Sequence, residues 1–124
     1  ERPTFTPNDI ISLSTPGSFQ QCGFERELQE VERRYPNTRV YYDAFGATLT
    51  VSGSIRGLIN CQDKLWDMAA QQALILAAGG SVALISETSE QPSPSDPIES
   101  FKSFSANWIG GEEALVREIR AVFP

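Results

Sequence analysis

The stretch TRVYYDAFGATLTVS, which spans Thr38–Ser52, carries the strongest secondary-structure signal in the chain. Its first part is rich in β-branched and aromatic residues, and its last part alternates, with Leu49 and Val51 on one face. The four residues AFGA separate the two parts, and Gly46 can adopt the positive φ that a tight turn needs. The pattern predicts a β-hairpin whose first strand points Val40 toward the core.

A helix is predicted on each side of this hairpin. Between residues 21 and 35, apolar side chains recur at helical spacing and charged side chains fill the other faces. The second helix is predicted to begin at Asn60, as its N-cap, and to end at about Ala78, before Gly79-Gly80. The residues between Gly53 and Gly57 are expected to form only a short connection to this helix.

Two short apolar runs, 10–14 and 81–86, predict a first and a last strand around these elements. The order of elements predicts an α+β fold, namely a ferredoxin-like βαββαβ two-layer sandwich. We expect a single α/β domain over residues 1–124, and its parts follow one another as an extended arm at 1–8, a core at 9–86, an acidic Pro/Ser-rich loop at 87–99 and an aromatic segment with a C-terminal helix at 100–124. In the last part, Phe104 and Trp108 are predicted to be buried.

The composition of the 124-residue chain limits the kinds of catalytic and metal sites that it can form. It has 16 acidic and 10 basic residues, a net charge of −6 and no histidine, which excludes Ser-His-Asp and Cys-His hydrolases and ordinary zinc sites. Asp63 and Asp67 lie four residues apart and could serve as an acid–base pair in a small hydrolase, but Asp63 is explained more simply by the helix dipole. We therefore predict a protein that is not an enzyme, with no catalytic residue, no metal and no cofactor.

The two cysteines, Cys22 and Cys61, are an even number in a small chain, which predicts one disulfide and a secreted protein. The alternative is a pair of buried free thiols in a cytoplasmic protein. No apolar run approaches the roughly 20 residues that span a bilayer.

A binding surface for a protein partner is predicted at the hairpin. Tyr41 points away from the core face, together with Arg39, and Phe45 lies in the predicted turn, where burial is difficult. Aromatic side chains dominate interface hot spots. We predict that Arg39, Tyr41 and Phe45 form this surface. Tight nucleic-acid binding is not expected, because the net negative charge opposes the electrostatic attraction to phosphates that dominates nucleic-acid affinity.

The paired helix–strand pattern over residues 9–86, the Pro-containing arm and the two cysteines resemble small secreted fungal effectors of the killer-toxin-like α/β sandwich group. That resemblance implies an extracellular or host-delivered protein without enzymatic activity, which acts by binding a protein partner.

A second resemblance points to an intracellular alternative. TRVYYDAFGATLTVSG followed by a helix is similar to the second half of a KH domain, which implies binding of single-stranded nucleic acid or assembly with a ribonucleoprotein. The GxxG clamp of that family is absent, because five residues separate Gly17 from Gly23.

Overall fold

The computed structural model describes residues 10–41, 45–89 and 104–124. Its strands are β1 (Ile11–Leu13), β2 (Thr38–Val40), β3 (Gly57–Asp63), β4 (Ser81–Ser89) and β5 (Phe104–Gly111), and its helices are α1 (Pro16–Gln21), α2 (Glu25–Arg34), α3 (Phe45–Val51), α4 (Leu65–Ala77) and α6 (Glu113–Arg120). The strands form one mixed sheet in the order β2-β1-β3-β5-β4. In it β1 is parallel to β2 and β3, whereas β5 is antiparallel to β3 and β4.

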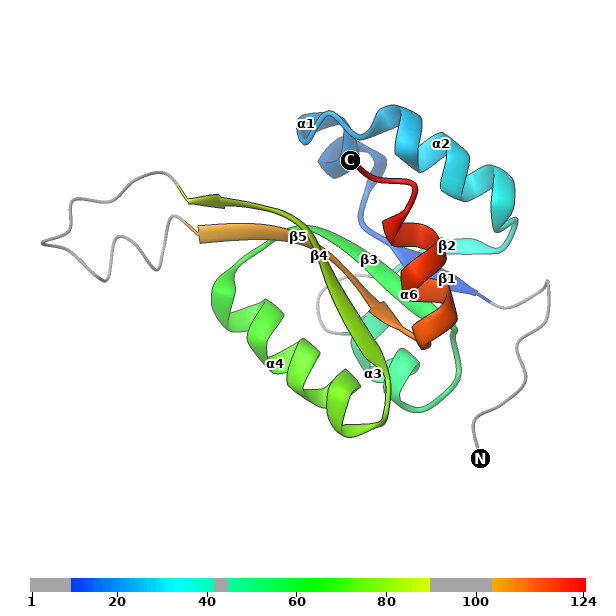
Figure 1. Ribbon diagram of the computed structural model, residues 1–124, viewed down its shortest axis with the longest axis vertical. Coiled ribbons are helices and arrows are strands. Elements are labelled where there is room, and N and C mark those ends of the chain that lie inside the picture. The colour runs from blue at the N-terminus through cyan, green and yellow to red at the C-terminus, as the bar shows by residue number, and fades with distance from the viewer. Residues whose placement is uncertain (1–9, 42–44, 90–103) are drawn as a thin grey trace, which may run out of the picture.

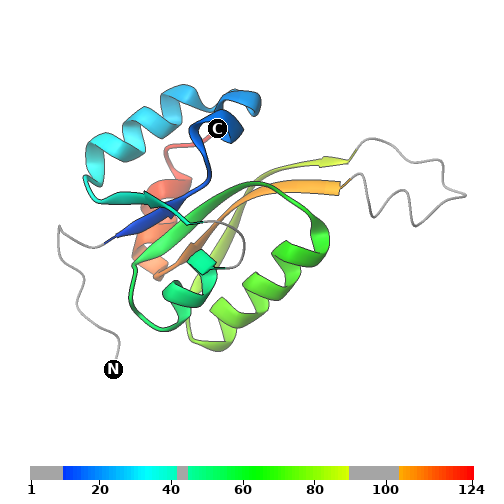
Figure 2. The ribbon, with the colours of Figure 1, turned by 180° about the vertical axis from the view of Figure 1, so that it is seen from behind.

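Helices cover both faces of this sheet. In Figure 1, α1, α2 and α6 lie above the strands and α3 and α4 lie below them, and the view from behind in Figure 2 shows the same division. We call these the α2/α6 face and the α3/α4 face. The α+β class is confirmed, but a sheet of five strands with helices on both faces is not a two-layer sandwich, so the ferredoxin-like arrangement is not confirmed.

The larger core lies on the α2/α6 face. The side chains that build it come from alternate positions of the strands and from one side of each helix: Ile11, Leu13, Phe19, Phe24, Leu28, Val31, Ile59, Cys61, Ile85, Ile109, Leu115, Val116, Ile119 and Phe123. The rings of Phe24 and Phe123 meet edge to face at 5.2 Å between centroids. At the other end of α2, the Tyr35 hydroxyl donates to Glu118, and burial, followed by this carboxylate, raises the pKa of Tyr35 to about 12.

A smaller core on the α3/α4 face is built around Trp108, which is fully buried as the sequence predicted. Ala47, Leu58 and Ile75 pack around its ring. Gly110 makes room for this packing, since a Cβ there would lie 2.7 Å from the Trp108 ring and 2.8 Å from Ile75. A residue with a side chain at that position would displace the indole or the Ile75 side chain.

The predicted hairpin is wrong, although its first strand exists. Thr38–Val40 is β2, which pairs in parallel with β1, and Phe45–Val51 is a helix instead of a second strand. Tertiary packing overrides the strand pattern, because Ala47 joins the Trp108 core and Gly46 lies against Ser12, 2.7 Å from where its Cβ would stand. Val40 is 40% exposed, so the prediction that it faces the core is also wrong.

The predicted second helix begins too early, because residues 57–63 form the central strand β3 instead of a connection and a helix start. The helix begins at Leu65, and Asp63 ends the strand instead of occupying the first helical turn. The predicted first helix, at 21–35, corresponds to α2 and begins later, at Glu25; a separate helix, α1, precedes it and was not predicted, and Gly23, with a φ of 76°, lies between the two. The first strand, the last strand of the predicted core and the C-terminal helix are confirmed.

Two irregularities in the sheet meet at Asn107 of β5. The β3–β5 register shifts between Asn60 and Asp63, where Gln62 has a φ of 61°, and the β4–β5 register shifts between Leu84 and Ser86. Asn107 serves both bulges, since its Oδ1 accepts from the Gln62 N–H at 2.8 Å and its Nδ2 donates to Ser86 at 2.8 Å. The bulge in β3 re-aims the end of that strand, which positions the candidate site.

Candidate functional site

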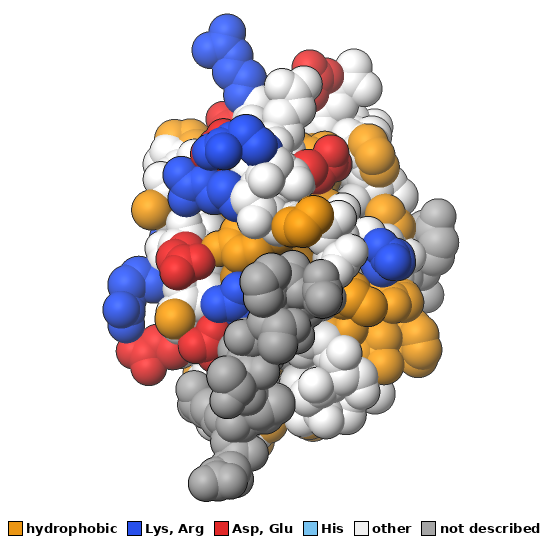
Figure 3. Space-filling model, turned by 90° about the vertical axis from the view of Figure 1, so that its right-hand side faces the viewer, with side chains coloured by type: hydrophobic (Ala, Val, Ile, Leu, Met, Phe, Trp, Pro, Cys, Tyr) orange, Lys and Arg blue, Asp and Glu red, His pale blue; other side chains and the backbone are white. Residues whose placement is uncertain are grey.

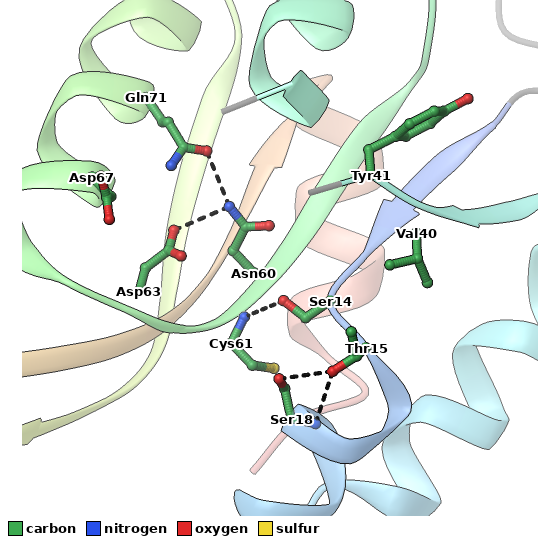
Figure 4. Close-up of a pocket in the computed structure, with 10 residues that line it drawn as sticks. All are labelled: Ser14, Thr15, Ser18, Val40, Tyr41, Asn60, Cys61, Asp63, Asp67 and Gln71. Atoms are coloured by element: carbon green, nitrogen blue, oxygen red, sulfur yellow. Dashed lines mark hydrogen bonds between the residues drawn. The ribbon is translucent and has the colours of Figure 1, made fainter. Parts of the chain in front are cut away.

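A pocket of about 380 Å³ lies at the carboxyl ends of the parallel strands β1, β2 and β3. The residues that line it follow those strand ends or begin the next helices: Ser14, Thr15, Ser18, Val40, Tyr41, Asn60, Cys61, Asp63, Asp67 and Gln71. Figure 4 shows the carboxylates on one side of the pocket and Val40 and Tyr41 on the opposite side. Open α/β sheets bind ligands in this position, outside the carboxyl ends of their strands.

A polar network forms the floor of the pocket. The Asn60 amide donates to Asp63 Oδ2 at 3.0 Å and to Gln71 Oε1 at 3.1 Å, and the Trp108 indole N–H donates to the same Asp63 oxygen at 2.8 Å. In a regular strand, Asn60 and Asp63 would point to opposite faces of the sheet. The bulge at Gln62 brings both to the α3/α4 face, where the network can close.

The two carboxylates of the pocket differ in environment. Burial raises the pKa of Asp63, the hydrogen bonds from Trp108 and Asn60 oppose that rise, and the neighbouring charge of Asp67 adds to it. Asp67 lies in the first turn of α4 and is exposed. Asp63 is therefore an internal acceptor that positions Asn60, whereas Asp67 presents its carboxylate to the pocket.

Hydroxyl groups line the side of the pocket formed by the end of β1 and the start of α1. The Ser14 hydroxyl accepts from the backbone N–H of Cys61 at 2.8 Å, which joins this side to β3. Thr15 caps α1 by accepting from the Ser18 N–H at 3.3 Å, and the two hydroxyls lie 3.0 Å apart. These groups line the pocket with hydrogen-bond donors and acceptors. None of the residues that line it has a cationic side chain.

The predicted Cys22–Cys61 disulfide is wrong, because both cysteines are free thiols. Burial, foremost, and the nearby Cys22 thiol raise the pKa of Cys61 above its ordinary value. Cys22 instead directs its thiol to Asn107 Oδ1, at 3.4 Å. The break between α1 and α2 brings Cys22 to the same side of the sheet as Cys61, so the even count of cysteines reflects packing at the core and not a bridge.

The predicted partner-binding residues lie at the edge of this pocket. The rings of Tyr41 and Phe45 meet at 5.6 Å with an interplanar angle of 75°, and Phe45 is 55% exposed, as the sequence predicted. Tyr41 lines the pocket, and Arg39 lies exposed on β2 with its guanidinium donating to the Thr38 carbonyl. Binding of a protein by these three residues stays a prediction, and Tyr42 and Asp43 lie outside the described residues.

Sequence reasoning identified Asp63 and Asp67 but gave them a shared helix, and it assigned Tyr41 and Cys61, which also line the pocket, to a protein-binding surface and a disulfide. Ser14 and Thr15 were not singled out, and Asn60 was predicted only as a helix N-cap, because the strand β3 was not predicted. The available signal was their position directly after, or within, apolar runs that become parallel strands.

The described residues form no group of three or more Asp, Glu, Cys or His side chains that could hold a metal ion. Asp63 and Asp67 alone therefore do not complete such a group within residues 10–41, 45–89 and 104–124. Over the same residues, no helix has both the length and the apolar character that crossing a membrane requires.

No protein family and no curated protein sequence matches this chain. Its structure is similar to an inositol monophosphatase from Zymomonas mobilis, with a TM-score of 0.69 and 15% identity over 94% of this chain and 42% of that one. It is also similar to the extragenic suppressor protein SuhB from Bartonella henselae, with a TM-score of 0.64 and 20% identity over 94% and 42%. SaIMPase-II bound to inositol monophosphate has a TM-score of 0.70 and 15% identity over 97% and 43%.

The chain thus has the fold of part of these proteins and spans less than half of their length. The resemblance to killer-toxin-like fungal effectors is wrong, and so is the KH-like alternative, because the neighbours are inositol monophosphatases and SuhB. The same finding overturns the expectation of a non-enzymatic protein. The prediction of secretion rested on the effector resemblance and the disulfide, and it loses both supports.

Proposed function

We propose that the chain binds phosphate monoesters of polyhydroxylated alcohols and forms part of a phosphomonoesterase site. The observation that carries this proposal is the pocket at the carboxyl ends of β1, β2 and β3, lined by hydroxyl, amide and carboxylate groups. Two structural neighbours support the ligand class, since one holds inositol monophosphate and another holds 2′-AMP. Both ligands are phosphate esters of a ring-borne secondary alcohol.

The network on the pocket floor explains how a polyol would be recognised. Both amide hydrogens of Asn60 are already used by Asp63 and Gln71, so its carbonyl oxygen is left to accept a hydrogen bond from a ligand. Figure 4 shows this oxygen pointing away from Asp63 and toward the side of Tyr41. A site with a fixed acceptor discriminates strongly against ligands that lack the matching hydroxyl group.

Hydrolysis of the ester would proceed by attack of water on phosphorus. The new bond joins the water oxygen to phosphorus, the bond from phosphorus to the ester oxygen breaks, and the alcohol leaves with a proton from solvent. Asp67 is the exposed carboxylate of the pocket and takes the proton of the attacking water in this proposal. Asp63 and Gln71 act through Asn60 as positioning residues.

The proposal is tested by measuring calorimetric binding of inositol monophosphate to the 124-residue chain, together with release of inorganic phosphate. We expect saturable binding with a dissociation constant of about 1 mM or lower, and phosphate release above that of buffer. Asp67→Asn should abolish phosphate release, because the isosteric amide cannot accept the proton.

A matched control is Glu113→Gln, which changes the exposed acidic residue in the first turn of α6, on the other face of the sheet. It should leave binding and phosphate release unchanged. Absence of saturable binding by the folded wild-type chain would refute the assignment of the pocket. Binding without phosphate release would refute the hydrolytic part and leave a binding site.

A further inference from the structure

The large apolar side chains that remain exposed are concentrated on one face of the sheet. Among the described residues they are Val40, Phe45, Val51, Trp66, Leu74, Leu76 and Leu84. Val40 lines the pocket, whereas the other six lie on α3, on α4 or on the edge strand β4, and none of the seven belongs to α2 or α6. Leu84 shares its side of β4 with Val82, which packs against the Trp108 core. An apolar surface of this extent indicates contact with another molecule.

Helix α4 is apolar on the side that faces away from the sheet as well as on the side that faces it. Its inner side carries Gln71 and Ile75, which are buried. The opposite side follows helical spacing, and the four residues along it are all exposed: Trp66, Ala70, Ala73 and Ala77. Figures 1 and 2 show α3 and α4 as the outermost described elements on this side of the sheet. Because a helix that is apolar all round is normally buried, the outer side of α4 has the character of a contact surface.

The order of large and small side chains along this outer side is self-complementary. If a second copy of α4 lies antiparallel to the first and crosses it close to its midpoint, Trp66 of each copy comes opposite Ala77 of the other. The same operation brings Ala70 opposite Ala73, so only small side chains meet at the crossing point. Small side chains there allow the two helix axes to approach to about 8 Å. At each end of the crossing, a large indole then lies over a small side chain.

Leu74 fits the same arrangement, because the two-fold operation brings it opposite Ala69. Both residues are exposed, and Leu74 is exposed by 53%. Each large side chain of the stripe therefore meets a small one, and every contact occurs twice, as an interface between identical copies requires.

We propose that the α3/α4 face is a self-association surface, through which two copies of this chain form a two-fold symmetric dimer with their α4 helices antiparallel. The inference is independent of the proposed function, because no ligand enters the argument. The dimer covers the outer side of α4 and leaves the charged helices α2 and α6 in water.

The distribution of charge favours a second copy over a different protein. With a net charge of −6, two copies repel one another unless they meet through an uncharged surface. Helix α3 has no charged residue and α4 has only Asp67, which lines the pocket, whereas seven of the ten residues of α2 are charged. A different protein would gain no specificity from charge pairs on the outer side of α4. Interfaces between identical chains are the more apolar kind.

The available area is sufficient for a dimer. Six large side chains of this face are each exposed by 38–55%, and the exposed alanines of α4 add to them. Together they present an apolar area on the order of the 800 Å² per partner that a stable interface buries.

The test is sedimentation equilibrium of the 124-residue chain between about 1 and 200 μM. We expect a monomer–dimer equilibrium with a dissociation constant of about 10 μM. Ala73→Glu places a charge at the crossing point and Leu74→Glu places one beside it, so each should raise the dissociation constant at least tenfold. Gln29→Glu adds the same charge to the exposed side of α2 and should leave the dissociation constant unchanged.

The register is tested by a charge pair. Ala70→Lys combined with Ala73→Glu in one chain places opposite charges across the two-fold axis, so this double variant should recover association to within about tenfold of wild type. Unfolding midpoints at about 1 μM, where every variant is a monomer, verify that the fold is kept.

A folded wild-type chain that stays monomeric at about 200 μM would overturn the proposal and leave this face to a different polypeptide. Dimers that persist in both Ala73→Glu and Leu74→Glu would place the interface elsewhere, for example at the edge of β4, and would equally overturn it. If the single variants are monomeric and the double variant does not recover association, the antiparallel pairing of α4 is wrong.

Discussion

The two faces of the sheet differ in what covers them and in what they carry. On the α2/α6 face, a large apolar core lies under helices whose outer surfaces are charged, with Glu30 paired to Arg33 and Arg34 and Glu113 paired to Arg117. Figure 3 shows charged side chains of both signs in the upper part of the view, over α2. On the α3/α4 face, the core is small and a polar network connects it to the pocket.

Helix α4 shows the contrast most clearly. Its sequence, LWDMAAQQALILA, contains one charged residue, and Trp66, Leu74 and Leu76 are 47%, 53% and 54% exposed. Such a composition is typical of a helix that is packed on both sides, whereas α2 and α6 have the apolar stripe of helices that face water. The α2/α6 face therefore contributes mainly stability, whereas the α3/α4 face combines stability with the proposed recognition of a ligand.

The largest effect that separates the faces is expected for Trp108→Ala. This variant removes a fully buried indole and its hydrogen bond to Asp63, so it should cost about 3–5 kcal/mol of unfolding free energy in urea denaturation. Ile119→Ala on the α2/α6 face should cost about 2–5 kcal/mol. Under conditions where both variants are folded, only the Trp108 variant should lose binding of inositol monophosphate. Equal loss of binding in both would erase the functional distinction between the faces.

A smaller effect is expected at the bulges that join the faces. Asn107→Leu leaves the backbone N–H of Gln62 and the Ser86 hydroxyl without this partner, which should cost about 1–3 kcal/mol. Because the bulge aims Asp63 at Trp108, the NMR signal of the Trp108 indole N–H should also shift. Ser86→Ala removes only one of these hydrogen bonds and should leave that signal in place; a shift of equal size there would contradict the role given to the bulge in β3.

The polar network should give the α3/α4 face a pH dependence. Since burial raises the pKa of Asp63, its ionised form is penalised in the folded state, so its contribution to stability is greatest below the ordinary pKa of an aspartate and is lost as the pH rises through the folded value. The stability of Asp63→Asn relative to wild type should therefore be lowest at acidic pH and should increase toward neutral pH. Melting temperatures of both proteins from pH 4 to 7 measure this difference, and parallel curves would refute it.

The smallest stability effect is expected on the outside of α4. Leu74→Glu and Leu76→Glu replace exposed side chains, so each should change the unfolding free energy by no more than about 0.5 kcal/mol. Both should reduce the fluorescence of a dye that binds apolar surface. Arg26→Glu on the exposed side of α2 should leave the dye signal unchanged. A large loss of stability in either leucine variant would show that the outer side of α4 belongs to the core.

Hydrophobic periodicity correctly predicted the elements whose buried faces follow from their own residues. It failed where contacts with residues distant in the sequence determine the secondary structure. The first strand, the strand after Gly80 and the last helix needed only their own residues. The segment 45–51 alternates like a strand, yet Gly46 must lie against Ser12 and Ala47 against the Trp108 core, which only a helix achieves. No local signal reports either contact.

The candidate site was hidden for a related reason. Asn60 and Asp63 share a face only because Gln62 adopts a positive φ in a bulge that Asn107, 45 residues away, stabilises. Asp67 was recognised as a carboxylate near Asp63, but the pocket could not be predicted until β3 was known to run parallel to β1. Neither the bulge at Gln62 nor the parallel pairing of β1 with β3 can be predicted from helical or strand periodicity.

The central claim is that the carboxyl ends of β1, β2 and β3 bind a phosphorylated polyol. The most direct measurement is titration of the isotope-labelled chain with inositol monophosphate, followed by amide chemical shifts. The account predicts saturable shifts at Ser14, Thr15, Asn60 and Asp67, with α6 unaffected. Shifts confined to α2 and α6, or no saturable shift at the strand ends in the folded chain, would contradict it.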